Sequence, residues 1–275
     1  MEVLLHQIDA FADAPFSGNP AAVMPLPSWL PDELLQNLAE ENNLAETAFY
    51  TAQLPPEAAQ TPDAPTDRPV FHLRWFTPAA EVDMCGHATL ASAAQILEDL
   101  HPGVDRVSFY TRSGWLHVDR TDDDEYVLDL PAVGSVETDP DPALVDALGV
   151  RPVRAYSGPD EVLVLASESE VREATPLLGA FPPLPRGAII AAPGDEVDLV
   201  SRFFAPGVGI PEDPVTGSAH AQLVPLWAER TGRSLVVARQ LSRRGGALRC
   251  ELVGDRVLLI GRCRRYLDGV VQLSD

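Results

Sequence analysis

Short apolar runs rich in β-branched and aromatic residues recur along the chain, separated by turns rich in Gly, Pro and Asp. Runs of this length and composition are typical of β-strands. They predict strands that outnumber the helices, which indicates an α+β fold. The predicted strands cover residues 3–10, 21–24, 70–76, 106–111, 115–120, 126–130, 188–192 and 256–260.

Helical periodicity appears in a few segments. Residues 31–42 place Leu34, Leu35 and Leu38 on one face, with Ser28 as the candidate cap, and a short helix is expected at 143–148. Two further helices, starting near His87 and Ser218 and continuing to about residues 100 and 230, are apolar on most sides. Helices of this kind are buried, so we expect the strands to wrap around these two.

One stretch has the composition of a surface loop. Residues 55–69 contain five prolines and offer little to bury, which predicts an exposed insertion without a core strand. A domain boundary is better placed at the Asp- and Pro-rich residues 138–142.

The two sides of that boundary resemble each other. Residues 74–78 (Arg-Trp-Phe-Thr-Pro) are echoed by 202–206 (Arg-Phe-Phe-Ala-Pro), and each run leads to a glycine and a helix of small residues. The segment Ser-Gly-Asn-Pro at 17–20 is likewise echoed at 157–159. Two echoes in the same order, about 130 residues apart, indicate the duplication of one unit.

Charge and composition exclude several classes of function. Acidic residues outnumber basic ones 41 to 20, which gives a formal net charge of −21. This charge disfavours binding to nucleic acids and to anionic membrane surfaces. No leader or membrane span is visible, so a cytoplasmic protein is expected. All basic residues are Arg. Without Lys the chain can form neither a pyridoxal Schiff base nor a Walker A phosphate loop.

Metal and nucleophile motifs are also lacking. The three cysteines, Cys85, Cys250 and Cys263, match neither a zinc spacing nor a disulfide framework. HExxH, GxSxG and a GxGxxG that follows a strand do not occur. We therefore predict no metal site and no cofactor.

The glycines Gly86 and Gly217 start the two buried helices. The first N–H groups of a helix are unsatisfied and carry a partial positive charge, so these starts could hold a substrate carboxylate without Lys. The alternative is that both glycines only permit tight strand-to-helix turns.

Three segments resemble the PhzF-like phenazine-biosynthesis protein family: residues 41–49 (ENNLAETAF), 76–89 (FTPAAEVDMCGHAT) and 212–219 (EDPVTGSA). The opening residues 9–11 and 16–20 match as well. The resemblance implies a pseudo-duplicated diaminopimelate-epimerase-like fold, with two lobes that are each a β-barrel-like sheet around a central helix. We place the lobes at residues 1–135 and 136–261, with a strand at about 262–275 that can return to the first lobe.

The resemblance also implies the site, in the cleft between the lobes. Glu46 would be the acid/base, with His87 and Asp213 as helpers. The substrate-binding residues would be Asn19, Gly86, Gly217 and Ser218. Taken alone, Glu46 could be a solvated carboxylate at a helix end, His87 a residue at a helix start, and Asp213 an N-terminal cap.

The sequence departs from the family in places. The insertion at 55–69 lengthens the gap between Glu46 and His87, and the family's QGxxxGRPS segment is eroded at residues 240–248, where Gln240 and Gly245 persist. Cys85 stands where diaminopimelate epimerases carry their first catalytic cysteine, but the second position is Pro214. We therefore assign Cys85 to packing.

The resulting expectation is a cofactor-independent isomerase acting on a small carboxylate-bearing metabolite. Glu46 should be desolvated, with a pKa above the roughly 4.3 of a free glutamic acid. An amino-acid epimerase, using Glu46 with Asp213 or Cys85, is the alternative enzyme. A non-catalytic metabolite-binding protein is the alternative outside enzymes, and a homodimer stays open.

Overall fold

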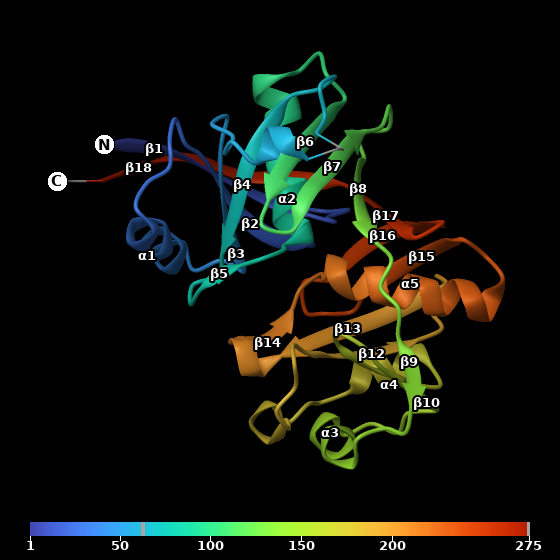
Figure 1. Cartoon of the computed structure of the whole chain (residues 1–275). Coiled ribbons are helices and arrows are strands. Elements are labelled where there is room, and N and C mark those ends of the chain that lie inside the picture. The colour runs from blue at the N-terminus through green and yellow to red at the C-terminus, as the bar shows by residue number, and fades with distance from the viewer. Residues whose placement is uncertain (62–63, 274–275) are drawn as a thin grey trace. The chain divides into compact units, whose positions relative to one another are not determined.

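The computed structural model describes residues 1–61 and 64–273. The chain divides into two compact units. The first comprises Met1–Asp129 and the segment from Ile260 onward, and the second comprises Leu130–Leu259 (Figure 1). Both units are rich in strands, which confirms the α+β prediction.

Strands dominate the first unit. They are β1 (Glu2–Ala10), β2 (Asn19–Pro25), β3 (Glu46–Thr51), β4 (Val70–Phe76), β5 (Glu81–Val82), β6 (Arg106–Thr111), β7 (Gly114–Arg120), β8 (Tyr126–Pro131) and β18 (Cys263–Gln272). The helices are α1 (Asp32–Asn42), α2 (Gly86–Gln95), the 3₁₀ turn η1 (Ala58–Gln60) and the π-helical η2 (Ile96–Leu100). β1 pairs antiparallel with β2 and with β18, so the first and last strands of the chain lie side by side (Figure 1).

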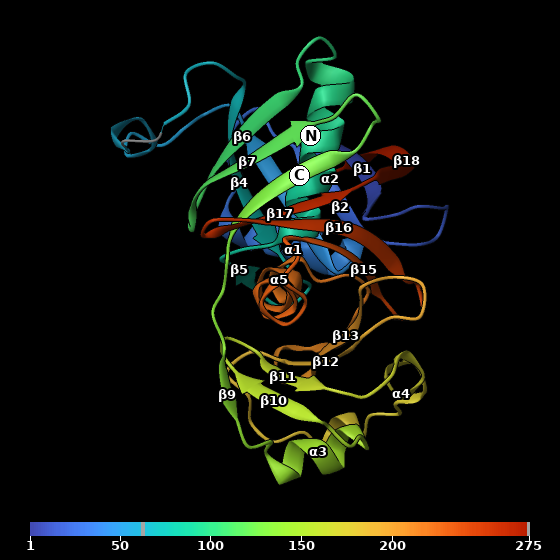
Figure 2. The same cartoon turned by 90° about the vertical axis from the view of Figure 1, so that its right-hand side faces the viewer.

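α2 is the central helix of the first unit. All of its residues are buried, and it contacts β1, β2, β3 and β18 (Figure 2). Small side chains such as Ala88, Ala91 and Ala94 allow strands to approach its axis closely. The predicted buried helix is thus confirmed, although its last turn, to Leu100, is π-helical.

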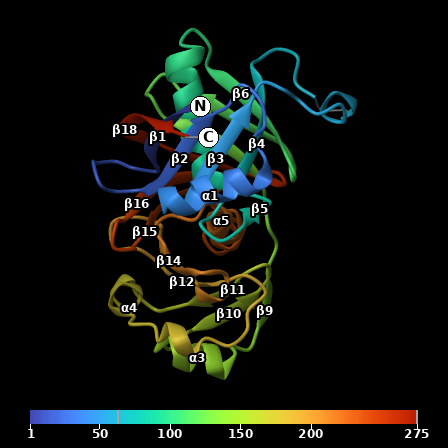
Figure 3. The ribbon, with the colours of Figure 1, turned by 90° about the vertical axis from the view of Figure 1, so that its left-hand side faces the viewer.

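α1 lies against β3 and β4 on the outside of the sheet (Figure 3). Leu35 and Leu38 pack with Met24 and Phe49 in one hydrophobic cluster, as the periodicity predicts. The predicted cap is wrong, because the N-cap residue is Pro31 and no side chain caps the helix. Ser28 lies outside the first turn.

Strands also dominate the second unit. They are β9 (Val136–Thr138), β10 (Arg154–Ser157), β11 (Glu161–Val164), β12 (Ala188–Ala192), β13 (Leu199–Ala205), β14 (Ile210–Asp213), β15 (Leu235–Gln240), β16 (Gly246–Val253) and β17 (Arg256–Gly261). The helices are α3 (Pro142–Leu148), α4 (Glu168–Glu173), α5 (Gly217–Thr231), η3 (Leu178–Ala180) and η4 (Pro206–Val208). Figure 2 views α5 almost end-on, with strands of its own unit on both sides.

The strand pairings repeat from one unit to the other. β2 pairs parallel with β3, β3 antiparallel with β4, and β4 parallel with β6. In the second unit β11 pairs parallel with β12, β12 antiparallel with β13, and β13 parallel with β15. The pairings therefore support the duplication that the sequence echoes indicate.

Equivalent ion pairs reinforce this duplication. Arg74 on β4 makes a two-pronged hydrogen bond to Glu81, and its guanidinium lies 5.2 Å from the ring of Phe76. Arg202 on β13 does the same with Glu212, and it lies 5.0 Å from Phe204. Both units use the arginine and the phenylalanine in the same contacts, which explains why the two five-residue echoes have these residues at matching places.

The described residues of the loop, 55–61 and 64–69, supply no core strand, as predicted, and they project from the first unit (Figure 2). The loop is nevertheless anchored: Ala58 is fully buried, and the hydroxyl of Thr61 accepts a hydrogen bond of 2.6 Å from Trp115 Nε1. Ala58 is the one buried residue among the described residues of the loop, so the prediction that the insertion buries little is confirmed. Residues 62–63 of this loop lie outside the described residues.

Candidate functional site

Glu46 is the first residue of β3. The chain leaves α1 through Asn43 in the left-handed conformation and enters the sheet at once, where Glu46 pairs with Ala21 of β2. Its side chain is only 11% exposed. The alternative in which Glu46 is a solvated carboxylate at a helix end is therefore wrong, because the residue is buried and begins a strand. Its burial agrees with the desolvation expected of an acid/base.

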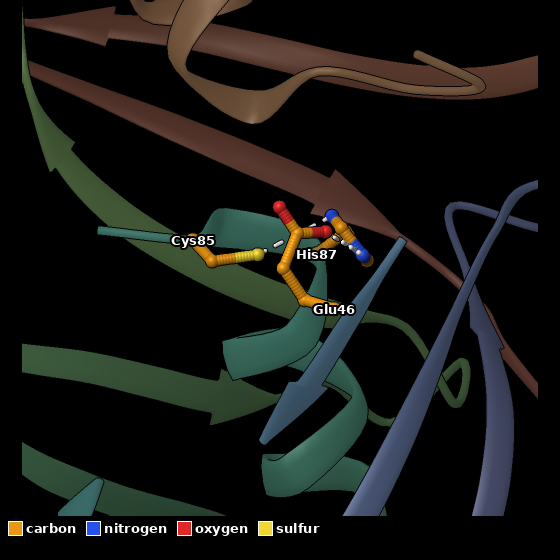
Figure 4. Close-up of side chains that lie close together, drawn as sticks. All are labelled: Glu46, Cys85 and His87. Atoms are coloured by element: carbon orange, nitrogen blue, oxygen red, sulfur yellow. Dashed lines mark hydrogen bonds and ion pairs between the residues drawn. The ribbon is translucent and has the colours of Figure 1, made fainter. Parts of the chain in front are cut away.

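His87 lies in the first turn of α2 and points at Glu46 (Figure 4). Its Nε2 is 3.2 Å from Glu46 Oε2. Burial lowers the pKa of His87 to about 3, and a hydrogen bond with the backbone of Pro20 opposes this shift only in part. The ring is therefore neutral at physiological pH, and its contact with Glu46 is not an ion pair.

The other nitrogen of His87 defines the tautomer. The side-chain amide of Asn19, at the start of β2, lies with Nδ2 3.2 Å from His87 Nδ1. Because an amide N–H can only donate, Nδ1 acts as the acceptor. In a neutral imidazole the proton then sits on Nε2, which faces Glu46.

Cys85 precedes α2 and joins this group of residues. It is 5% exposed, as the packing assignment requires, but its Sγ also lies 3.4 Å from His87 Nδ1. Ligating atoms of Glu46, Cys85 and His87 all lie within 4.8 Å of one another. Sequence reasoning missed this cluster, because only the short Cys-Gly-His spacing hinted at a thiol beside the histidine.

Asp213 ends β14 in the second unit and is 8% exposed. It does not cap α5, so that alternative reading is wrong: the N-cap residue is Thr216, whose hydroxyl donates to Asp213 Oδ2. Gly217 and Ser218 form the first turn of α5, as expected. The predicted residues of this unit thus share one strand-to-helix connection.

Gln240, at the end of β15, fixes this connection. Its Oε1 accepts from the backbone N–H of Thr216 at 2.9 Å, and its Nε2 donates to the backbone carbonyl of Asp213 at 2.7 Å. Ser242 adds a hydrogen bond of 2.8 Å to the carbonyl of Pro214. The eroded segment 240–248 therefore supports the start of α5, a role that sequence reasoning missed although Gln240 itself persists.

His220 is a second fully buried histidine, one turn into α5. Its Nδ1 donates to the backbone carbonyl of Thr216 at 2.8 Å. Burial lowers its pKa to about 4, so this ring is also neutral at physiological pH. Neither composition nor spacing pointed to it.

The duplicated strands differ at their acidic positions. Thr47 pairs with Phe76 as Ala188 pairs with Phe204, so the residue equivalent to Glu46 is Gly187. A Cβ at Gly187 would lie 2.6 Å from the ring of Phe203, so no side chain fits there. By the same comparison Val82 is equivalent to Asp213. Each unit therefore carries one acidic candidate that the other lacks.

Residues 8–263 match the family model described as phenazine biosynthesis-like protein. The chain belongs to this PhzC-PhzF family. A relative from Pseudomonas aeruginosa, named an uncharacterized isomerase, is 44% identical, and the alignment covers 100% of both chains. The crystal structure of a PhzF-family protein from Enterococcus faecalis superposes with a TM-score of 0.90 at 39% identity, covering 99% of this chain and 100% of that one.

Solved structures with lower sequence identity to this chain include proteins named as epimerases and racemases. A hydroxyproline epimerase from Agrobacterium vitis matches with a TM-score of 0.62 at 13% identity, over 100% of this chain and 93% of that one. At that identity the likeness shows the fold alone, which is the predicted diaminopimelate-epimerase-like fold. The PhzF-like identity and the fold are thereby confirmed, and relatives of this chain are named isomerases.

Among the described residues, none of the helices combines the length and the apolar character that crossing a bilayer requires.

Proposed function

We propose that this PhzF-family protein is a cofactor-independent isomerase that moves a proton on a small carboxylate-bearing metabolite, with Glu46 as the acid/base. The observation that carries the proposal is the buried Glu46 carboxylate, 3.2 Å from the Nε2 of a neutral His87. Catalytic carboxylates are commonly found in such desolvated places, because desolvation brings their pKa closer to the working pH.

In this mechanism Glu46 removes a proton from an activated carbon and returns it elsewhere on the same face of the substrate. His87 is a neutral N–H donor at physiological pH, so it orients and stabilises the ionised carboxylate rather than donating as an imidazolium. Asn19 keeps the His87 proton on Nε2, and we assign it this positioning role in addition to the substrate contact predicted for it.

The substrate carboxylate is proposed to bind at helix starts. Gly86 begins the ten-residue helix α2 beside His87, and its first-turn N–H groups need acceptors. Gly217 and Ser218 offer the same kind of donors at α5. That both starts, together with Asp213, act on one substrate molecule stays a prediction. It requires Asp213→Asn to lower turnover of the same substrate that Glu46 converts.

An amino-acid epimerase is the second candidate, and one observation favours it. The thiol of Cys85 contacts His87, so the site holds a second group able to carry a proton. An epimerase takes a proton from one face and delivers it to the other. Chiral analysis of the product therefore separates the two candidates.

The deciding experiment compares Glu46→Gln with the control Glu41→Gln, an exposed glutamate on α1. A thermal-shift screen of small carboxylate metabolites would first supply a substrate. Glu46→Gln keeps the shape of the side chain but loses the base, so turnover should fall by about 10²–10⁴-fold, with little change in affinity. The control should stay near wild type. An active Glu46→Gln variant would end the proposal.

A further inference from the structure

The cluster of Glu46, Cys85 and His87 combines three side-chain types that bind divalent transition metals. Thiolate, imidazole and carboxylate are the usual ligands of zinc. Their ligating atoms lie within 4.8 Å of one another, and all three side chains are buried. Ligands about 2.0–2.3 Å from a tetrahedral zinc ion lie about 3.3–3.8 Å apart, which is within the 4.8 Å limit that the three ligating atoms meet.

Charge balance also suits a cation. A thiolate at Cys85 and the carboxylate of Glu46 together carry two negative charges, which balance the two positive charges of a divalent ion. The neutral complex is therefore not repelled by the partial positive charge at the start of α2. A neutral imidazole binds a metal through its unprotonated nitrogen, which in His87 is Nδ1, 3.4 Å from Cys85 Sγ. Binding releases one proton from the Cys85 thiol to solvent and involves no redox step.

The second unit provides an internal comparison. The positions equivalent to Glu46, Cys85 and His87 are Gly187, Thr216 and Ser218, a set with no thiol, imidazole or carboxylate. Among the described residues, Glu46, Cys85 and His87 form the one group of three or more such ligands. The duplication therefore predicts one binding site per chain rather than two.

We propose that Glu46, Cys85 and one ring nitrogen of His87 bind a thiophilic divalent cation such as Zn²⁺, with the remaining position left for water. Such an ion would occupy the lone pairs of the carboxylate that acts as the base. It would therefore inhibit the isomerase reversibly. The inhibition rests on the proposed function, whereas the metal site itself does not.

The binding test needs no substrate. Zn²⁺ is titrated into the purified chain in competition with a chromophoric chelator, for wild type, Cys85→Ser, His87→Asn and the control Cys263→Ser. Cys263 is a thiol of the same unit that bonds to the carbonyl of Leu90 and lies outside the cluster. We expect one ion per chain. Each ligand variant should weaken binding at least about 10-fold, as even loss of an outer-shell partner does. The control should not weaken it.

Co²⁺ substitution keeps the test sharp if a variant fails to fold. Wild type with one equivalent of Co²⁺ should show a thiolate-to-cobalt charge-transfer band, and Cys263→Ser should keep it. A missing band, or unchanged Zn²⁺ affinity in folded Cys85→Ser and His87→Asn, would overturn the proposal. Turnover is measured separately: Zn²⁺ should abolish it and a chelator restore it. An active Glu46→Gln variant would remove the inhibition argument but leave the binding result intact.

Discussion

The side-chain amide of Asn19 lies with Nδ2 3.2 Å from Nδ1 of His87, a contact in which the amide is the donor and Nδ1 the acceptor. With Nδ1 occupied as an acceptor, the neutral ring presents Nε2–H toward Glu46. The two residues come from β2 and α2, and both are more than nine-tenths buried. A histidine that is neutral at physiological pH is thereby placed with its Nε2 3.2 Å from the carboxylate of the proposed base.

Asn19→Asp tests this relationship with almost no change in shape. A carboxylate at this place accepts from Nδ1–H, which raises the pKa of His87 and moves its proton away from Glu46. We expect turnover to fall by about 10²-fold, at the low end of acid–base effects. The ¹⁵N shifts of the His87 ring report the tautomer directly. Unchanged ring shifts in the variant would contradict the assignment.

The two buried histidines make stability depend on pH. The pKa of His87 is lowered to about 3 and that of His220 to about 4, both from 6.5, by burial. Below about pH 6.5 these two imidazoles therefore take up protons in the unfolded chain but stay neutral in the folded chain. Stability from these residues is fully present above that pH. It falls as the pH drops toward 4, by up to about 1.4 kcal/mol per pH unit for each histidine.

Urea unfolding between pH 4.5 and 7.5 measures this slope. His220→Gln removes one of the two titrations while leaving the Glu46 site in place, so its free energy of unfolding should vary less steeply with pH than that of wild type. An identical slope in the variant would show that His220 takes up its proton in the folded state.

Local sequence patterns predicted many of the strands because short apolar runs carry their own signal. β4, β6 and β12 begin and end at the predicted residues. β3 was missed for a physical reason: it starts with an acidic residue, and all six of its side chains are buried, so it shows no alternation of apolar and polar positions. The residue that begins this strand is Glu46, the proposed acid/base.

The site was only partly predictable, because its residues meet through tertiary packing. Glu46 lies beside His87 only because β3 contacts the buried helix α2, and no spacing rule encodes that contact. The family resemblance supplied the candidates Glu46, His87 and Asp213, whereas the structure supplied the partners of each. Gln240 shows the same limit: its segment looked eroded, yet the side chain that persists bonds to Thr216 and Asp213.

Cys85→Ala separates packing from chemistry. If the thiol only fills space, its removal leaves a small cavity and should lower stability by about 1 kcal/mol, with turnover within a few-fold of wild type. In the epimerase alternative the same substitution removes a proton carrier, so turnover should collapse while the fold survives. Thermal unfolding and initial rates on one preparation distinguish these outcomes, with Cys263→Ser as the control for thiol loss.

Deuterium content of the product tests whether Glu46 works as a single enclosed carrier. A carboxylic acid whose side chain is 11% exposed exchanges its proton with bulk water more slowly than an open one. If Glu46 returns the proton that it removed, product made in D₂O should therefore contain less than one deuterium per turnover at the new C–H position. Two-base epimerisation predicts one full deuterium, because the second group draws its proton from solvent.

Mass spectrometry at low conversion gives the number of deuterium atoms per turnover, and incubation of unlabelled product with Glu46→Gln corrects for exchange outside the reaction. Complete labelling in wild type would rule out an enclosed shuttle and move the assignment to a second acid, with Cys85 and Asp213 as the residues to substitute next.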